Sequence, residues 1–214
     1  MGINVPVGEG LRVLCLGAHS DDIEIGCGGT ILRLFEEYRD VSVHWVVFGA
    51  DAARGIEARE SAASFLEKAK HQTVEIRNFR DGFFPYIGAE IKEYFEALKN
   101  EISPHVIFTH YRYDLHQDHR LICELTWNTF RDHLVLEYEI LKYDGDLGTP
   151  NFYVRLSEDI CRNKIRKIFS HFKSQVGKSW FSEDSFFSLL RLRGVESNSP
   201  DRYAEAFYCR KGVL

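Results

Sequence analysis

Histidine and aspartate side chains at close spacing mark residues 18–24 (AHSDDIE), where His19 is followed by the adjacent Asp21 and Asp22. Imidazole and carboxylate groups without thiolates form the donor set of a catalytic zinc site, which uses three protein ligands and leaves one position for water. A metal held in this way lowers the pKa of bound water towards about 7, which makes a nucleophile at neutral pH. Because neighbouring side chains diverge, one carboxylate of the pair can bind a metal while the other faces the water.

A second cluster occupies residues 110–119, where the spacing H-x-D-H places Asp118 between His116 and His119. This spacing allows one imidazole to bind a metal while another is held by a carboxylate. The first histidine of the segment, His110, stays outside this candidate set. Each cluster alone has an ordinary explanation as a helix cap or a polar helix start, but two of them at equivalent places in the fold favour a metal centre.

The elements that must position these clusters are apolar strands alternating with helices. Strands are expected over residues 11–18, 41–48, 73–79 and 105–109, and helices over 30–38, 56–70 and 89–99, followed by a helix over 157–173 and a strand over 204–210. This rhythm predicts a Rossmann-like α/β fold, with a mostly parallel sheet and helices on both faces. Ligands bind at the carboxyl ends of the strands in such sheets, and both clusters directly follow an expected strand.

Length and composition limit the remaining classes of protein. The chain has 214 residues without a linker or a repeat, so one domain over residues 1–214 is expected. Its net charge of −5 and pI near 6.0 argue against nucleic-acid binding. Since no apolar run approaches the ~18 residues of a membrane span, no membrane insertion is expected. Five cysteines without a C-x-x-C pair, and a start unlike a signal peptide, favour a cytoplasmic protein.

The glycines of residues 26–29 (GCGG) have two interpretations. Their spacing differs from the G-x-G-x-x-G of a dinucleotide-binding loop, so we expect them to let a helix pack closely against the sheet. Nucleotide binding is the alternative that this stretch leaves open.

Both clusters resemble the signatures of a known family. The segments A-H-S-D-D-I-E-I-G-C-G-G (residues 18–29) and D-L-H-Q-D-H (residues 114–119) are similar to those of the LmbE/PIG-L de-N-acetylases, metal-dependent amidases that deacetylate N-acetylglucosamine-type sugars. Residues 80–84 and 203–207 are similar to a turn and a late strand of the family, so the resemblance covers most of the chain. Ser20 stands where the family usually has proline, and Glu24 follows the aspartate pair at a variant spacing, which implies only indirect support of the ligands.

The resemblance implies roles for several residues of the two segments and for Asp81. The implied metal ligands are His19, Asp22 and His119, and Asp21 is the implied general base. His116 would stabilise the oxyanion or protonate the leaving amine, with Asp118 orienting it. Asp81 would face the sugar hydroxyls. Zinc is the expected metal, although nitrogen and oxygen ligands also accept Fe²⁺ or Co²⁺.

These observations predict a zinc-dependent hydrolase that removes an N-acetyl group from a small-molecule amino-sugar conjugate. Two alternatives stay open at this point. One is the same amidase chemistry on a different N-acyl substrate, and the other is a non-catalytic Rossmann-like protein that binds a nucleotide. Assembly into a homo-oligomer is a further expectation that the sequence leaves open.

Overall fold

The computed structural model describes residues 10–212 of the chain. That all of residues 1–214 form one domain stays a prediction, because residues 1–9 and 213–214 lie outside this range. In chain order the elements are β1 (Leu11–Gly17), α1 (Asp22–Glu37), β2 (Val41–Val47), α2 (Ala52–Phe65), β3 (His71–Ile76), η1 (Phe84–Tyr86), α3 (Gly88–Glu101), β4 (Val106–His110), α4 (Gln117–Thr129), β5 (Leu134–Tyr138), β6 (Phe152–Leu156), α5 (Glu158–His171), η2 (Lys173–Gln175), α6 (Glu183–Glu196) and β7 (Tyr203–Cys209).

A mixed sheet forms the centre of the molecule. Within residues 10–212 it has seven strands in the order β3-β2-β1-β4-β5-β7-β6, and the five strands β1 to β5 run parallel. Strand β7 pairs antiparallel with both β5 and β6. The chain moves outward from β1 through β2 to β3 and then returns to the other side of β1 at β4. This reversal of strand order makes a crevice beside β1 the place where such folds bind ligands.

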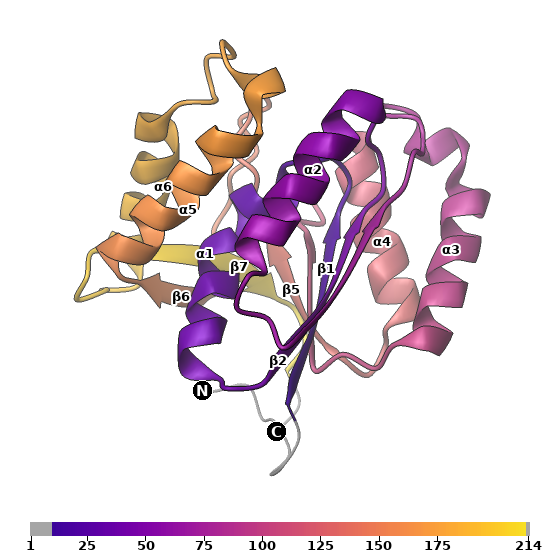
Figure 1. Ribbon diagram of the computed structural model, residues 1–214, viewed down its shortest axis with the longest axis horizontal. Helices are drawn as coiled ribbons and strands as arrows, with labels where there is room; N and C mark the ends of the chain where they lie inside the picture. Colours follow the sequence, from indigo (N-terminus) through magenta and orange to yellow (C-terminus); the bar gives the residue numbers. More distant parts are fainter. Residues whose placement is uncertain (1–9, 213–214) are drawn as a thin grey trace.

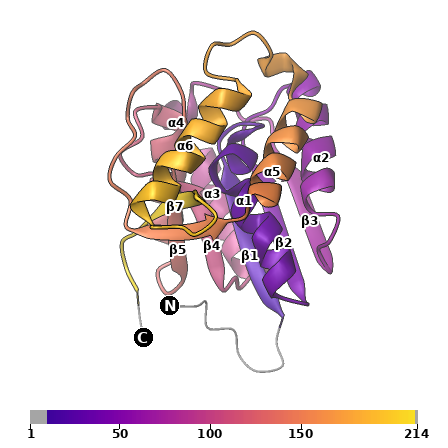
Figure 2. The same ribbon diagram turned by 90° about the vertical axis from the view of Figure 1, so that its left-hand side faces the viewer.

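Helices cover both faces of the sheet, as the sequence predicts (Figure 1). Helices α1, α2, α5 and α6 lie on one face and α3 and α4 on the other (Figures 1 and 2). Each face has its own apolar core: Trp45 and Phe65 belong to the first, and Phe48 and Phe95 to the second. Because β1 is buried on both faces, its sequence is a nearly continuous apolar run. No helix within residues 10–212 has the length and apolarity needed to cross a membrane.

The first helix differs most from its prediction. It begins at Asp22 instead of residue 30, so it includes the glycines that the sequence analysis placed before it. A Cβ added to Gly26 would lie 2.2 Å from Cδ2 of Tyr138, and one added to Gly29 would lie 2.6 Å from Cδ1 of Leu156. Close packing therefore requires glycine at these positions, which confirms the packing interpretation and removes the main support for a nucleotide loop.

Other differences concern boundaries and the second half of the chain. Helix α2 begins four residues earlier than predicted, at Ala52, because Asp51 caps it by accepting a hydrogen bond from the Arg54 amide at 2.9 Å. The predictions did not include α4, β5, β6 and α6. The apolar pattern of α6 is weak, because its ends and much of its outer side are exposed. Its packing is decided by tertiary contacts with β7.

Candidate metal centre

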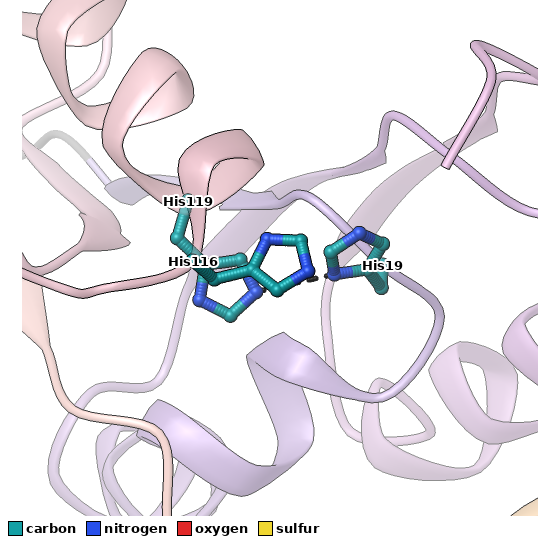
Figure 3. Close-up of side chains that lie close together, drawn as sticks. All are labelled: His19, His116 and His119. Atoms are coloured by element: carbon teal, nitrogen blue, oxygen red, sulfur yellow. Dashed lines mark hydrogen bonds between the residues drawn. The ribbon is translucent and has the colours of Figure 1, made fainter. Parts of the chain in front are cut away.

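The two polar segments come together at one edge of the sheet. Strands β1 and β4 are parallel neighbours, with Cys15 paired to Phe108, so the residues that follow each strand emerge side by side. The first segment enters α1 at Asp22, and the second ends in the first turn of α4. Figure 3 shows the rings of His19, His116 and His119 gathered at this edge. The sheet therefore unites histidines that lie about one hundred residues apart in the chain.

Three of the predicted ligands point one atom each at a common space. His19 Nδ1 lies 3.1 Å from His119 Nε2, and Asp22 Oδ2 lies 3.4 Å and 3.5 Å from these two nitrogens. A tetrahedral zinc ion with bonds of about 2.0–2.1 Å separates its ligand atoms by roughly 3.3–3.4 Å. The three separations are close to this value, so these atoms of His19, Asp22 and His119 have the spacing of zinc ligands. Overlapping groups at this edge also have the spacing of metal ligands, namely His19 with His116 and His119, His19 with Asp81, His116 and Asp118, and Asp22 with His110 and His119.

Asp22 is aimed by the turn in which it lies. Its Oδ2 accepts a hydrogen bond from the His19 backbone N–H at 2.6 Å, which closes the turn between β1 and α1. The same oxygen lies 3.3 Å from Nε2 of His110, the last residue of β4. Burial alone would raise the pKa of Asp22, but His119 and His110 lower it well below its usual value. Asp22 is therefore anionic, as a carboxylate metal ligand must be.

The carboxylates around His19 stabilise positive charge on its ring. Burial alone would lower the pKa of His19, but hydrogen bonds with Asp118, Asp22 and Asp81 raise it well above its usual value. His19 Nε2 lies 3.3 Å from Asp118 Oδ2 and 3.1 Å from Asp81 Oδ1. An environment that stabilises positive charge on this ring also suits a divalent cation bound at its Nδ1.

His119 is held in the tautomer that a ligand requires. Its Nδ1 lies 2.9 Å from Oδ2 of Asp114, so the proton sits on Nδ1 and the lone pair of Nε2 faces Asp22. Burial, and the neighbouring His110 after it, lower the pKa of His119 to about 4. The ring is therefore neutral at pH 7, as metal binding demands.

The predicted base, Asp21, lies beside the ligands and is buried, with 7% of its surface exposed. Burial, followed by the charge of Asp22, raises the pKa of Asp21 to about 6. A carboxylate with a pKa close to neutrality transfers protons most effectively at physiological pH. Its N-cap position is not used for a side-chain capping bond, which leaves the carboxylate free of that role.

His116 occupies the N-cap of α4, where its Nδ1 accepts a hydrogen bond from the Asp118 backbone N–H at 3.3 Å. The ring proton therefore sits on Nε2. Burial, with the charge of His19 second, lowers the pKa of His116 below its usual value. The side chain is thus a neutral imidazole that can donate from Nε2.

Asp118 contacts His116 through its backbone N–H, and orientation of His116 by the Asp118 carboxylate stays a prediction. Its carboxylate is fully buried and accepts hydrogen bonds from the backbone N–H groups of Gly82 at 2.6 Å and Phe84 at 3.1 Å. Its remaining contact in the site is the 3.3 Å approach to His19 Nε2. The connection after β3 folds over the start of α4, and Asp118 holds it there through these two hydrogen bonds. Its approach to His19 also orients that ring.

Asp81 lies at the mouth of the site with about half of its side chain exposed. Its Oδ2 accepts a hydrogen bond from Arg54 Nη1 at 3.0 Å, while Oδ1 faces His19. The hydrogen bond with His19, more than any other contact, lowers the pKa of Asp81 to about 2. Contact with a substrate hydroxyl stays a prediction for this residue.

Glu24 lies deeper in α1 and contacts none of the three ligand atoms. Its Oε1 accepts a hydrogen bond from Ser61 Oγ at 2.6 Å, which links α1 to α2. Burial raises the pKa of Glu24 well above its usual value. Its support of the ligands is therefore limited to the packing of α1.

Three further residues take part that the sequence analysis left outside its candidate set. His110 Nε2 accepts a hydrogen bond from the Ala18 backbone N–H at 2.8 Å and so ties the first polar segment to β4. Asp114 bonds to His119, and Lys142 lies 3.0 Å from Asp114. The position of His110 at the end of β4 was a usable signal, whereas no spacing rule connects Lys142 to this edge.

Comparison with known proteins identifies the family to which the chain belongs. Residues 14–130 match the PIG-L family, described as GlcNAc-PI de-N-acetylase. This match covers more than half of the chain and includes both polar segments, so the chain belongs to the PIG-L family. The predicted enzyme class, a hydrolase of N-acetyl amide bonds, is the class that the family description names.

Individual relatives differ in how much of the chain they match. The uncharacterized deacetylase YaiS of Escherichia coli is 32% identical over 114 residues, which cover 50% of this chain and 61% of that protein. The diacetylchitobiose deacetylase of Thermococcus kodakarensis is 27% identical over 99% of this chain and 88% of its own length. Among solved structures, the 4-carboxy-2-hydroxymuconate hydratase GalB of Pseudomonas putida has a TM-score of 0.74 at 16% identity, covering 95% of this chain and 98% of that one. At that identity the likeness shows the fold alone.

Proposed function

We propose that this protein is a zinc-dependent hydrolase that removes the N-acetyl group from a small N-acetylglucosamine-type sugar conjugate. The observation that carries this proposal is the convergence of His19 Nδ1, Asp22 Oδ2 and His119 Nε2 at 3.1–3.5 Å, with the buried Asp21 beside them. The family description and the name of the diacetylchitobiose deacetylase support an acetylated amino sugar as substrate.

A zinc ion held by these three residues would supply a Lewis acid for the amide carbonyl and lower the pKa of a water molecule. Asp21 accepts the proton of the attacking water, because its raised pKa places it near the optimum for a base at neutral pH. His116 donates a hydrogen bond from Nε2 to the carbonyl oxygen as negative charge develops there. The lowered pKa of His116 supports a neutral ring for this task.

Asp118 and Asp114 keep the two histidine ligands in place. Asp118 faces Nε2 of His19, and Asp114 accepts a hydrogen bond from Nδ1 of His119. Carboxylates in this position fix the ring orientation and make the imidazole a better ligand. The proton that Asp21 takes from water can then pass to the leaving amine, which leaves poorly unless it is protonated.

The test is release of acetate by the zinc-loaded protein. We expect acetate from at least one of four substrates: N-acetylglucosamine, N,N'-diacetylchitobiose, and nucleotide-linked and lipid-linked N-acetylglucosamine. The same preparation stripped of metal should be inactive, and Fe²⁺ or Co²⁺ should restore activity to some degree because the donor set accepts them. A zinc-loaded protein that releases no acetate from any of the four, but does so from other N-acyl compounds, would overturn the amino-sugar assignment.

Location and assembly are part of the same proposal. The five cysteines are all free thiols, and four of them are buried, which suits a reducing cytoplasm. A homo-oligomer is compatible with a small-molecule substrate and is tested by light scattering of the purified protein.

A further inference from the structure

The connection between β5 and β6 brings Lys142 close to Asp114, which contacts the proposed ligand His119. Lys142 Nζ lies 3.0 Å from Oδ2 of Asp114, the same oxygen that lies 2.9 Å from Nδ1 of His119. The Lys142 side chain is 11% exposed and that of Asp114 is 2% exposed. This ammonium group is therefore largely removed from solvent, and a charge in such a place is costly unless it is paired.

Asp146, four residues further on, completes the arrangement. Its carboxylate pairs with Lys142 and also accepts a hydrogen bond from the Leu115 backbone N–H at 2.7 Å. The other oxygen of Asp114 accepts a hydrogen bond from the His116 backbone N–H at 2.8 Å. The two carboxylates thus hold the ammonium group between them, and each is also bonded to the backbone that leads into α4.

The connection is also anchored to α6, independently of Lys142. Arg193 of α6 forms an ion pair with Glu139 at 2.8 Å and donates a hydrogen bond to the Gly148 carbonyl at 3.1 Å. Residues 139 and 148 are therefore fixed to α6 whether or not Lys142 is present. Lys142 is consequently not needed to attach the connection to the rest of the fold, and its buried ion pair points to another task.

We propose that Lys142, held by Asp146, is a positioning residue that fixes Asp114 against His119 and thereby sets the affinity of the site for its metal. This proposal rests on the metal site proposed above. The carboxylate of Asp114 can orient His119 only while its own rotamer is fixed, and Lys142 supplies a second contact to the oxygen that faces His119. Groups that orient a ligand in this way typically change metal affinity by about 10–100-fold when they are removed.

The experiment measures zinc affinity by competition with a colorimetric chelator, which needs no substrate. We expect Lys142→Met to weaken zinc binding by about 10-fold or more, and Lys142→Arg to restore much of the loss. Lys167→Met is the matched control, because Lys167 is also 11% exposed and ion-paired, yet it lies on α5 against Ser64 and Glu67. This control should bind zinc like the wild type.

A second variant guards against misfolding of the first. Asp146→Asn keeps the lysine but weakens the contact that holds it, so zinc binding should fall in the same direction by a smaller factor. Thermal unfolding of metal-stripped protein, measured in parallel, separates affinity from stability. Unchanged or tighter zinc binding in both Lys142→Met and Asp146→Asn would overturn this proposal alone. A wild-type protein that binds no zinc would overturn the proposed function and this proposal with it.

Discussion

One buried cluster of charged side chains lies at the start of α1 and another beside its middle, and the two are organised in opposite ways. In the second, Glu205 of β7 accepts hydrogen bonds at 2.6–2.8 Å from Gly29 N, Thr30 N, Thr30 Oγ1 and Lys164 Nζ. Every carboxylate oxygen has matching donors, and Lys164 also bonds to the Ile25 carbonyl at 2.7 Å. This cluster is saturated, and its task is to join α1, α5 and β7.

The proposed metal centre has the opposite balance of donors and acceptors. The Asp22 carboxylate and the Nε2 lone pair of His119, both acceptors, face the same space at 3.5 Å together with His19 Nδ1. Acceptors that converge in a buried place are costly unless a cation lies between them. The difference between the clusters shows that burial and charge alone do not identify a functional site. Convergence of acceptor atoms on one space distinguishes the proposed centre from the saturated cluster.

The largest expected effect is loss of the metal from the converging cluster, which consists of His19, Asp22 and His119. His119→Ala removes one of three ligands, so zinc content after dialysis should fall from about one ion per chain to nearly none. Glu205→Gln alters only the saturated cluster, so this variant should keep the zinc bound at the other cluster. Elemental analysis of both variants checks this, and a His119→Ala protein with full zinc would remove this residue from the ligand set.

Asp21→Asn separates catalysis from metal binding within the centre. Asn cannot accept the proton of water, so kcat should fall by about 10²–10⁴-fold, while zinc content stays that of the wild type. Acetate release and elemental analysis on the same preparation give both values. Loss of zinc in this variant would show that Asp21 is a ligand and not the base.

Lys164→Met tests the saturated cluster through stability. Removing one partner of a buried ion pair costs about 3–5 kcal/mol in the free energy of unfolding. Denaturant unfolding measures this cost, and zinc affinity should not change, since Lys164 lies outside the centre. A loss below about 1 kcal/mol would mean that the backbone donors suffice to hold Glu205.

The smallest effect concerns Glu24, which lies between the two clusters. Its raised pKa means that the folded state holds this proton more tightly than the unfolded state does, so folding becomes less favourable as pH rises above the usual pKa of glutamate. Glu24→Gln should therefore have little effect on stability near pH 4.5 and stabilise the metal-stripped protein increasingly up to the folded pKa. The gain is at most about 1.4 kcal/mol per pH unit. Thermal unfolding from pH 4.5 to 8 measures it, and a flat difference would contradict the protonated state.

The sequence was informative where a local pattern sets the chemistry. The two polar segments could be placed together because each follows an apolar strand and carboxyl ends of parallel strands share one edge. The tautomer of His116 and the partner of Asp118 could not be predicted. Both depend on which backbone N–H lies nearby: that of Asp118 itself at the start of α4, and those of Gly82 and Phe84 from a loop that folds over it.

Long-range contacts explain what sequence reasoning missed. Helix α1 includes Gly26 because Tyr138, more than one hundred residues away, occupies the space of its side chain. Lys142 reaches Asp114 from an irregular connection, and no periodicity announces that contact. Local propensity predicts glycine as a helix breaker and a lone lysine as exposed, so tertiary packing overrides the expectation in both cases.

The most direct test of the converging cluster is the anomalous scattering of zinc in crystals of the protein. Our account predicts one strong peak about 2.0–2.2 Å from His19 Nδ1, Asp22 Oδ2 and His119 Nε2, with Asp21 and His116 outside bonding distance. A peak bound instead by the Asp81 and Asp118 carboxylates, or no peak in zinc-soaked crystals, would contradict the account.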